Sequence, residues 1–554
     1  MPSTAGETPA TASAASAASA AAGGVLLTLA AAQFLMTLDS SVMNVSIATV
    51  ANDVGTTVTG IQTAITAYTL VMATLMITGG KVGQILGRKR AFAIGCVIYG
   101  CGSLTTAIAP NLAILMIGWS FLEGVGAALI MPAIVALVAS NFVQTERPRA
   151  YGLIASAGAI AVAAGPLIGG LFTTYASWRW VFAGEVIVVL IILALTRRIA
   201  DTPPQGDARL DLVGTGLSAL GLGMIVYGIL RSGTWGFVQP KEGAPEWIGM
   251  SPVVWLIIGG AAVVRAFMVW ERRRLAAGKA SLIDPAMMKV PQLRSGLAAF
   301  LFQFLLQAGL FFTVPLFLSV ALGLSAIATG VRLLPLSVTL LLAAVGVPKV
   351  WPNASPRFVV RVGFLALFFG IVVMILALDA GAGPEIVTWP MLLAGLGVGA
   401  LASQLGSVTV SAVPDEQSGE VGGLQNTFTN LGASIGTALA GAVLISALTA
   451  SFLGALQDDP AVNRELANKA SVQLSGGIPF VSDKDLQTAL DKAGVPPQQA
   501  SAVADDYSSA RLDGLRASLS ILALFALIAL FFAGRIPDVQ PGAPPATAAG
   551  AAET

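Results

Sequence analysis

Long apolar runs recur along most of this 554-residue chain, and each is close to the length of a membrane span. An α-helix needs about 20 apolar residues to cross the hydrocarbon core of a bilayer. Only 11% of the residues are charged, against about 25% in soluble globular proteins, and the mean hydropathy is +0.81. Because lipid offers the backbone no hydrogen-bond partners, these runs predict an all-α polytopic membrane protein.

Separating the apolar runs at polar and basic breaks gives fourteen candidate spans. They lie at residues 25–49, 61–79, 91–109, 112–138, 150–172, 180–196, 211–230, 252–271, 296–318, 326–347, 358–378, 389–411, 424–450 and 515–534. An even number places both termini on one side, and 19 of the 30 Lys and Arg residues then face that side. By the positive-inside rule, we expect a multi-pass plasma-membrane protein with both termini in the cytoplasm.

Composition separates two tails and one polar insertion from these spans. Residues 1–22 are mostly Ala, Ser and Thr, and residues 536–554 are rich in Pro and Ala, so we expect two disordered cytoplasmic tails. Residues 451–513 carry mixed charges and short amphipathic patterns. They predict an extracellular helical loop in which Ser482 caps a helix.

Missing residue types exclude several classes of function. The chain has no histidine and two cysteines, which removes His-based triads, His-ligated metals and imidazole proton relays. It also has no phosphate-binding GxxxxGK[ST] loop. We therefore expect no enzyme, no cofactor and no metal site, and the net charge of +1 gives no support for a nucleic-acid partner.

The stretch "GGKVGQILGRKR", residues 79–90, combines closely spaced glycines with a basic run between two spans. Glycines permit close helix packing and a tight turn, and the basic run suits the cytoplasmic leaflet. The stretch resembles the loop signature of the major facilitator superfamily, except that Gln84 stands where the family has Asp. The gating residues that this resemblance implies are Gly80, Gly83, Gln84, Gly87 and Arg88.

A second stretch, "GAIAVAAGPLIGGLF" at 158–172, resembles the motif of the antiporters in this superfamily. Small residues let two helices approach closely, and a proline bends a helix by removing a backbone hydrogen bond. The conformational residues implied here are Gly165, Pro166, Gly169 and Gly170.

"LDSSVMNVSIATV" at 38–50 and the late segment 388–444 also resemble the fourteen-span drug:proton antiporters of this superfamily. The resemblance implies the major facilitator fold, with six-helix bundles at 23–198 and 291–535 and two extra helices with cytoplasmic linkers at 199–290. In such folds each half is built from inverted repeats of three helices.

Two carboxylates lie deep within predicted spans. Asp39 and Glu123 are each roughly 16 Å from the nearer span end, at about 1.5 Å of rise per residue. A charge at the bilayer centre costs at least about 2.5 kcal/mol, so we interpret both residues as sites for a proton or a substrate charge. Glu185 and Arg332 are second candidates. An ion pair of Arg332 with Glu123 or Asp39 is the structural alternative.

Thioether, aromatic and polar side chains share helix faces with these charges or lie on the late spans. They suit bulky lipophilic ligands, although each could instead fill a gap in the core. The expected cavity residues are Met36, Met43, Trp119, Ser120, Met131, Gln425, Asn426 and Asn430.

The sequence thus predicts a secondary active transporter that exports lipophilic, often cationic, compounds in exchange for protons. We expect it to act as a monomer in the bilayer by alternating access. One alternative is an exporter or flippase of a specific amphiphile, lipid or metabolite. Another is a non-transporting membrane receptor or scaffold, although a scaffold has no need of intramembrane charges.

Overall fold

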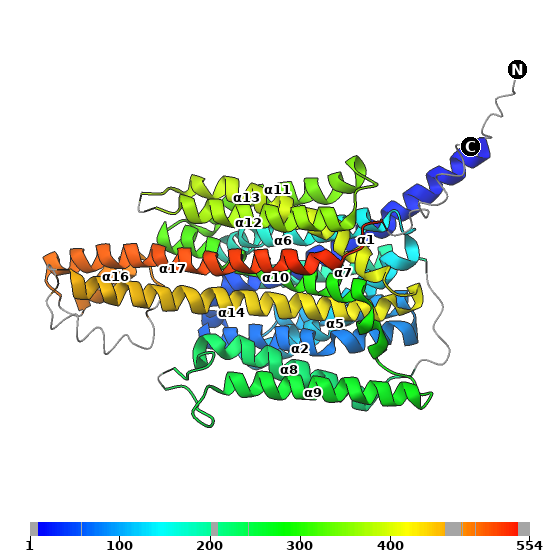
Figure 1. Ribbon diagram of the computed structural model, residues 1–554, viewed down its shortest axis with the longest axis horizontal. Coiled ribbons are helices and arrows are strands. Elements are labelled where there is room, and N and C mark those ends of the chain that lie inside the picture. Colours follow the sequence, from blue (N-terminus) through cyan, green and yellow to red (C-terminus); the bar gives the residue numbers. More distant parts are fainter. Residues whose placement is uncertain are drawn as a thin grey trace, which may run out of the picture.

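The protein is helical throughout the part that the structure, a computed structural model, describes. The described residues are 9–540 except 57, 201–208, 242, 380, 460–461, 463–477, 479 and 493–494. Among them the only β pairing is an isolated bridge between Trp247 and Met250. The long helices lie side by side along one axis (Figure 1), which confirms the all-α prediction. Predictions for residues 1–8, 463–477 and 541–554 lie outside the described residues.

The first half of the chain forms one helical bundle. Its core includes Phe92, Tyr99 and Phe182, and within it α1 packs against α6 and α3 against α5 and α7. The elements are α1 (Pro9–Asp53), α2 (Val58–Leu86), α3 (Arg88–Ala107), α4 (Leu112–Leu115), the π-helical η1 (Met116–Glu123), α5 (Gly124–Asn141), α6 (Arg147–Tyr175) and α7 (Arg179–Thr196).

The second half forms another bundle, with Phe364 and Leu515 in its core. Here α10 packs against α14, α11 against α13, and α12 against α13 and α17. The elements are α10 (Pro291–Leu316), η3 (Phe317–Ala321), α11 (Ala326–Val350), α12 (Pro356–Ala377), η4 (Pro384–Val387), α13 (Thr388–Val410), η5 (Asp415–Gln417), α14 (Ser418–Asp458), α16 (Asp483–Lys492), α17 (Pro497–Phe532) and η6 (Ala533–Arg535).

Two helices stand between these halves in the sequence. They are α8 (Leu212–Trp235) and α9 (Pro252–Ala276), followed by the short η2 (Pro285–Lys289). The pair lies at one edge of the molecule (Figure 1), and α8 contacts α2 of the first half and α14 of the second.

Thirteen described helices are long and apolar enough to cross a membrane. The remaining predicted span, 91–109, corresponds to α3, which begins with the basic residues Arg88, Lys89 and Arg90 and contains several glycines. These residues lower its hydropathy, yet α3 lies inside the bundle against α2, α5 and α7. The count of fourteen spans therefore stays a prediction.

Helix boundaries differ from the predicted segment boundaries at two places. α1 begins at Pro9, inside the predicted disordered tail, where the run of alanines favours a helix. α14 and α17 continue to Asp458 and start at Pro497, so both ends of the predicted 451–513 loop belong to these helices. Phe452 and Tyr507 pack in a small core between them. As expected, Ser482 caps α16 and its Oγ accepts from Asp485 N at 3.2 Å.

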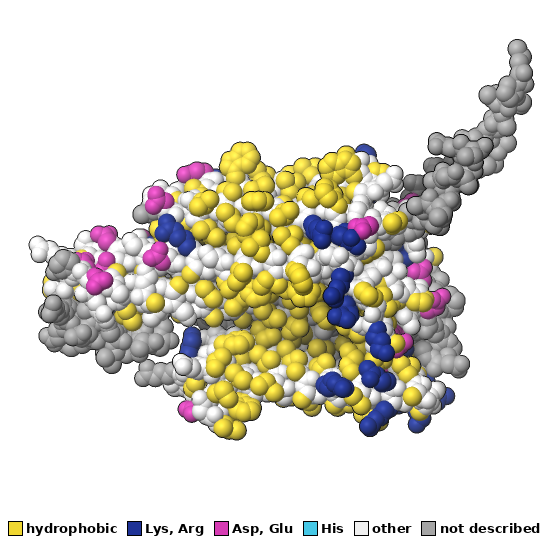
Figure 2. Space-filling model, in the orientation of Figure 1, with side chains coloured by type: hydrophobic (Ala, Val, Ile, Leu, Met, Phe, Trp, Pro, Cys, Tyr) yellow, Lys and Arg dark blue, Asp and Glu magenta, His cyan; other side chains and the backbone are white. Residues whose placement is uncertain are grey.

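The two ends of the bundle differ in charge. Lys and Arg on the visible face gather toward one end, at the right of Figure 2. This basic end carries Arg88, Arg147, Arg294 and Arg535, whereas α16 lies at the opposite end (Figure 1).

One close helix contact in the second half is testable. Gly436 of α14 lies against the backbone of α10, where an added Cβ would stand 2.1 Å from the carbonyl oxygen of Leu305. We expect Gly436→Val to force the helices apart and to lower the free energy of unfolding by about 1–3 kcal/mol, which is the usual cost of overpacking. The measurement is the Tm of the purified protein in detergent.

Gly454→Val on the same helix is the matched control, because nothing lies within 4 Å of a Cβ at Gly454. Equal Tm values for the two variants would contradict this close contact.

Candidate functional site

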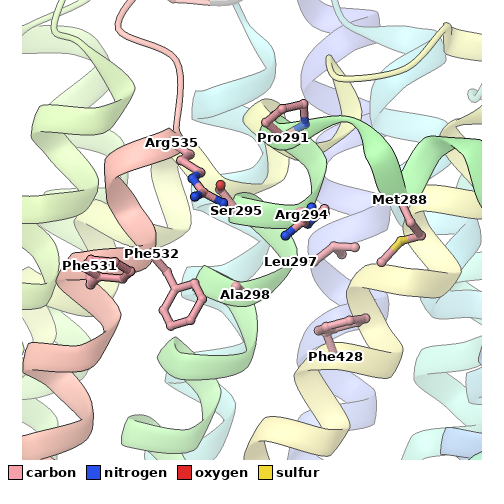
Figure 3. A pocket seen from close by; sticks show the side chains of 10 residues that line it. All are labelled: Met288, Pro291, Arg294, Ser295, Leu297, Ala298, Phe428, Phe531, Phe532 and Arg535. Atoms are coloured by element: carbon pink, nitrogen blue, oxygen red, sulfur yellow. The ribbon is translucent and has the colours of Figure 1, made fainter.

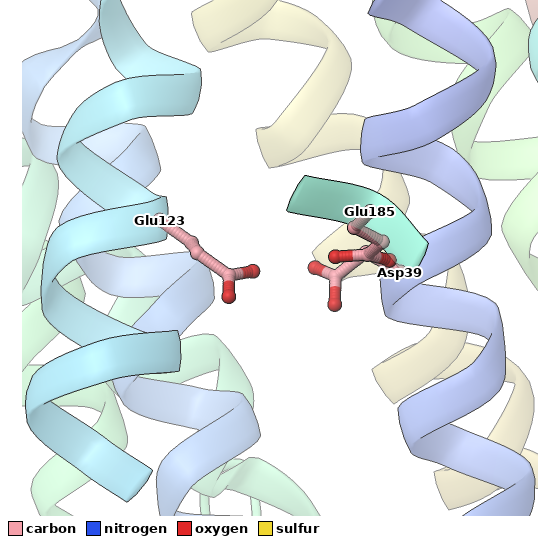
Figure 4. A group of neighbouring side chains, drawn as sticks. All are labelled: Asp39, Glu123 and Glu185. Atoms are coloured by element: carbon pink, nitrogen blue, oxygen red, sulfur yellow. The ribbon is translucent and has the colours of Figure 1, made fainter. Parts of the chain in front are cut away.

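Three acidic side chains from distant parts of the first half meet inside it. Asp39 lies on α1, Glu123 at the end of η1, and Glu185 on α7. Each offers an oxygen within 4.8 Å of an oxygen of the other two, and the three carboxyl groups point toward one another (Figure 4). All three residues are at most 2% exposed. We refer to Asp39, Glu123 and Glu185 as the acidic cluster.

Asp39 is held by an indole. The Nε1 of Trp119 donates to both carboxyl oxygens of Asp39, at 2.8 and 3.0 Å. Tyr68 of α2 stacks on the Trp119 ring with centroids 5.0 Å apart and an interplanar angle of 5°. The indole is thus clamped in position, and Asp39 is joined to the span that also carries Glu123.

Hydroxyl groups of α3 hold the two glutamates. Ser103 Oγ donates to Glu185 Oε2 at 3.1 Å, and Thr106 Oγ1 donates to Glu123 Oε1 at 3.2 Å. The other oxygens, Glu123 Oε2 and Glu185 Oε1, are buried without a hydrogen-bond partner among the described residues. The acidic cluster therefore has unused acceptor capacity.

Among the residues that the structure describes, no basic side chain pairs with the acidic cluster. None of the ion pairs in the described part of the chain includes Asp39, Glu123 or Glu185. Three carboxylates this close together in an apolar interior cannot all be ionised, because their repulsion and desolvation are uncompensated. The cluster must take up protons or a hard cation, for which carboxylate oxygens are suitable ligands.

Glycines and a π-helical turn place Glu123 in the acidic cluster. A Cβ on Gly102 of α3 would lie 2.6 Å from Glu123 Cγ, and one on Gly118 of η1 would lie 2.8 Å from the backbone N of Thr106. The two glycines therefore let α3 and η1 approach closely. π-helical turns are rare and occur frequently at functional sites.

A separate cavity lies between the two halves. Its volume is 320 Å³, at the lower end of the range of about 300–1,000 Å³ that is usual for small-ligand sites. The lining comes from α1, α5 and α6 of the first half and from α10, α11, α13 and α14 of the second. Its polar side chains are amides, hydroxyls and a phenol, and no charged residue is among the described lining residues.

The predicted cavity residues divide between this space and the protein core. Met131, Gln425 and Asn426 line the cavity. Asn430 is not in the lining, and its Nδ2 donates to Asn426 O at 2.9 Å. The other four predicted residues are at most 4% exposed and pack within the first half: Met36, Met43, Trp119 and Ser120.

α1 separates the cavity from the acidic cluster. Gln33 and Thr37 of α1 line the cavity, whereas Asp39 follows Thr37 by two residues, which is about 200° around a helix. Asp39 therefore faces the interior of the first half. A displacement of α1 that follows a change in the acidic cluster would also move a wall of the cavity.

α1 is packed tightly on the antiporter-like motif of α6. A Cβ on Gly165 would lie 2.3 Å from Ser41 Cβ, and one on Gly169 would lie 3.3 Å from Val42 Cα. Pro166 has no N–H, so the carbonyl of Val162 lacks its usual helical donor. Ser41 Oγ donates to that carbonyl at 3.2 Å.

The other two residues of this motif are Pro166 and Gly170. The side chain of Pro166 is outside the described set. A Cβ added at Gly170 would meet no atom within 4 Å.

Contacts at the basic end join the two halves. Lys81 Nζ lies 3.3 Å from Glu420 Oε1 and donates to Gln84 Oε1 at 2.9 Å. Gln84 Nε2 donates to Glu420 Oε1 at 3.2 Å. A Cβ on Gly80 would lie 2.3 Å from the carbonyl oxygen of Gly419. The acid of this contact therefore comes from α14, and Gln84 of α2 bridges to it.

The turn after α2 completes this contact. Gly87 has a φ of +95°, which favours glycine and starts α3. Arg88 donates to Ala136 O at 3.0 Å and to Asp415 O. Gly83 has only the Cβ of Ala91 near an added Cβ, at 4.0 Å.

The fourth predicted charge site, Arg332, belongs to the second half of the chain. It is half-buried on α11, and within the described residues it forms no ion pair with Glu123 or Asp39. The role of Arg332 as a site for a proton or a substrate charge stays a prediction.

The cavity residues of α10 were not predicted from the sequence. Phe300, Phe304, Gln307 and Phe311 recur at steps of four, three and four residues, and all line the cavity, as does Gln303. Two glutamines within an otherwise apolar span were the available signal, since polar side chains in spans generally face the protein interior.

Comparisons with known proteins agree with this architecture. A family model for the Major Facilitator Superfamily matches residues 29–437. The puromycin resistance protein pur8 of Streptomyces alboniger is 32% identical over 449 residues, covering 79% of this chain and 84% of that protein. A probable actinorhodin transporter of Streptomyces coelicolor is 28% identical over 478 residues, covering 83% and 77%.

A solved structure shows the same fold. The human organic anion transporter MFSD10 matches with a TM-score of 0.55 and 12% identity, over 93% of this chain and 98% of that one. At this identity the likeness concerns the fold alone. Together with the family model and the relatives, it shows that this chain belongs to the Major Facilitator Superfamily of membrane transporters and is not an enzyme.

Proposed function

We propose that this transporter exports lipophilic compounds, cationic ones included, in exchange for protons. The observation that carries the proposal is the acidic cluster, which is buried and has no basic partner among the described residues. Because the three acids cannot all be ionised, the cluster exchanges protons whenever its exposure to water changes. An exporter is consistent with the names of the relatives, which describe antibiotic resistance and transport.

Coupling to the substrate runs through α1. Thr37 faces the cavity, Asp39 faces the acidic cluster, and Ser41 touches α6. Protonation of Asp39 weakens its charge-assisted hydrogen bonds from Trp119. A substrate that displaces the cavity face of α1 then changes the proton affinity of the cluster, and linkage requires the reverse effect as well.

The lining of the cavity favours lipophilic substrates with hydrogen-bonding groups. Phe300, Phe304 and Phe311 offer aromatic faces, and Gln303 and Gln307 offer amides. An aromatic face attracts a cation through its ring electrons, so a cationic substrate needs no fixed negative charge in the cavity. A single specific amphiphile remains the competing substrate class, and competition among chemically different ligands distinguishes the two.

We further propose that the protein works by alternating access. We infer from the positive-inside rule that the basic end is cytoplasmic. The contacts among Lys81, Gln84 and Glu420 then close the cytoplasmic side. At the opposite end a cavity of 830 Å³ lies between α8, α10 and α14, lined by residues that include Phe312 and Ser434. We infer from these contacts a conformation that is closed on the cytoplasmic side, in a protein that acts as a monomer.

The charge of the acidic cluster is tested by Glu123→Gln. The amide keeps the acceptor for Thr106 but cannot exchange a proton, so we expect substrate accumulation to lose its dependence on an imposed pH gradient. One coupled proton sustains about tenfold accumulation per pH unit, and this factor should fall to about one. The measurement is flux into liposomes that contain the purified protein.

Glu385→Gln, at an exposed acid on η4, is the matched control. Asp39→Asn should act in the same direction as Glu123→Gln, and the double variant should be non-additive if the acids share a proton. Unchanged gradient dependence in Glu123→Gln would overturn its role. Transport driven by a sodium or calcium gradient instead would replace the proton by a hard cation.

The orientation is tested by labelling a cysteine in place of Gln487, an exposed residue of α16. The native Cys96 and Cys101 are first replaced by alanine. We expect an impermeant maleimide to label the new cysteine in intact cells, because α16 lies opposite the basic end. Labelling only in inverted vesicles would reverse the proposed topology.

The contact at the basic end is tested by Glu420→Gln, which removes the ion pair with Lys81. We expect the cytoplasmic side to open more often, so that a cysteine placed at the cavity residue Thr429 is labelled severalfold faster from that side. Glu146→Gln, at an exposed acid of the same end, is the control. Equal labelling rates for both variants would show that this contact does not hold the halves together.

A further inference from the structure

A cleft opens on the outer surface of the second half at the basic end. Its volume is 260 Å³, and it lies between the start of α10 and the end of α17, with one wall from α14. Arg294 and Arg535 face the cleft from the two helix ends, and Ser295 lies between them (Figure 3). Phe532 and Phe428 line its deeper part (Figure 3).

Neither arginine has a side-chain partner in the described part of the chain. Within the described residues, neither Arg294 nor Arg535 forms an ion pair or a side-chain hydrogen bond, and both are exposed. The neighbouring Arg357 differs, because it pairs with Asp538 at 2.6 Å. The cleft therefore presents two free guanidinium groups on adjacent helices.

The cleft residues lie at the depths that the headgroup and the acyl chains of a membrane lipid occupy. Candidate spans begin at Pro291 and end at Arg535, so both arginines lie where a span meets the headgroup layer. Phe531 and Phe532 are 81% and 42% exposed, one turn deeper on α17. The first turn of α10 adds backbone N–H groups and the positive end of its dipole.

We propose that this cleft binds an anionic glycerophospholipid of the leaflet at the basic end. The two guanidinium groups bind the headgroup phosphate, for which bidentate contacts are favourable. An acyl chain then lies over Phe532 and Ala298, where it covers apolar surface. Such a lipid joins α10 to α17, the first and the last long helices of the second half.

Thermal unfolding with defined lipids tests the site. Delipidated protein in detergent is titrated with phosphatidylglycerol, with phosphatidylcholine or with inorganic phosphate, and lipid retention is counted by native mass spectrometry. We expect phosphatidylglycerol to raise Tm and to remain bound as one molecule per chain. Removing both charges by Arg294→Gln and Arg535→Gln should weaken this binding about 25-fold, because each of the two contacts contributes about fivefold.

Arg272→Gln with Arg273→Gln is the matched control, since these exposed arginines of α9 lie at the same end but outside the cleft. Arg294→Lys with Arg535→Lys keeps the charge and should retain most of the binding. Equal loss in the control pair, or equal binding of phosphatidylcholine, would overturn the site. An equal shift with inorganic phosphate alone would show an anion site without a lipid.

Discussion

Close approach of helix backbones at small residues is the contact on which the rest of the structure depends. Lipid supplies no hydrophobic force between helices, so packing and hydrogen bonds must join them. Gly436 of α14 packs against α10, Gly80 of α2 against α14, and Gly165 of α6 against α1, each with no room for a side chain. Each contact serves a different junction: within the second half, between the halves, and between α1 and α6.

Glycine packing also makes the acidic cluster possible. Gly102 and Gly118 bring α3 against η1, so that hydroxyls of α3 reach the carboxyls of the cluster. Burial without a cation is unfavourable for these acids in their charged form. That cost is useful in a transporter, because it differs between conformations that admit water to the cluster and those that do not.

The cavity and the acidic cluster share a helix but no residue. In the proposed mechanism, this separation lets the protein recognise its substrate with uncharged groups and exchange protons at a different place. α1 connects the two, since Thr37 and Asp39 lie on opposite faces of one rigid helix. The cleft at Arg294 and Arg535 is a third feature, set apart from both at the lipid boundary.

Hydropathy and helix capping are local properties, so the helical class, nearly all the span positions and the cap at Ser482 could be predicted from the sequence. It also marked Asp39 and Glu123 as costly residues deep in the membrane. Only the tertiary structure brought Glu185 to them and turned Asp39 away from the cavity. Composition and spacing do not fix the rotation of a span about its own axis; that rotation is decided by which neighbouring helices approach and how closely.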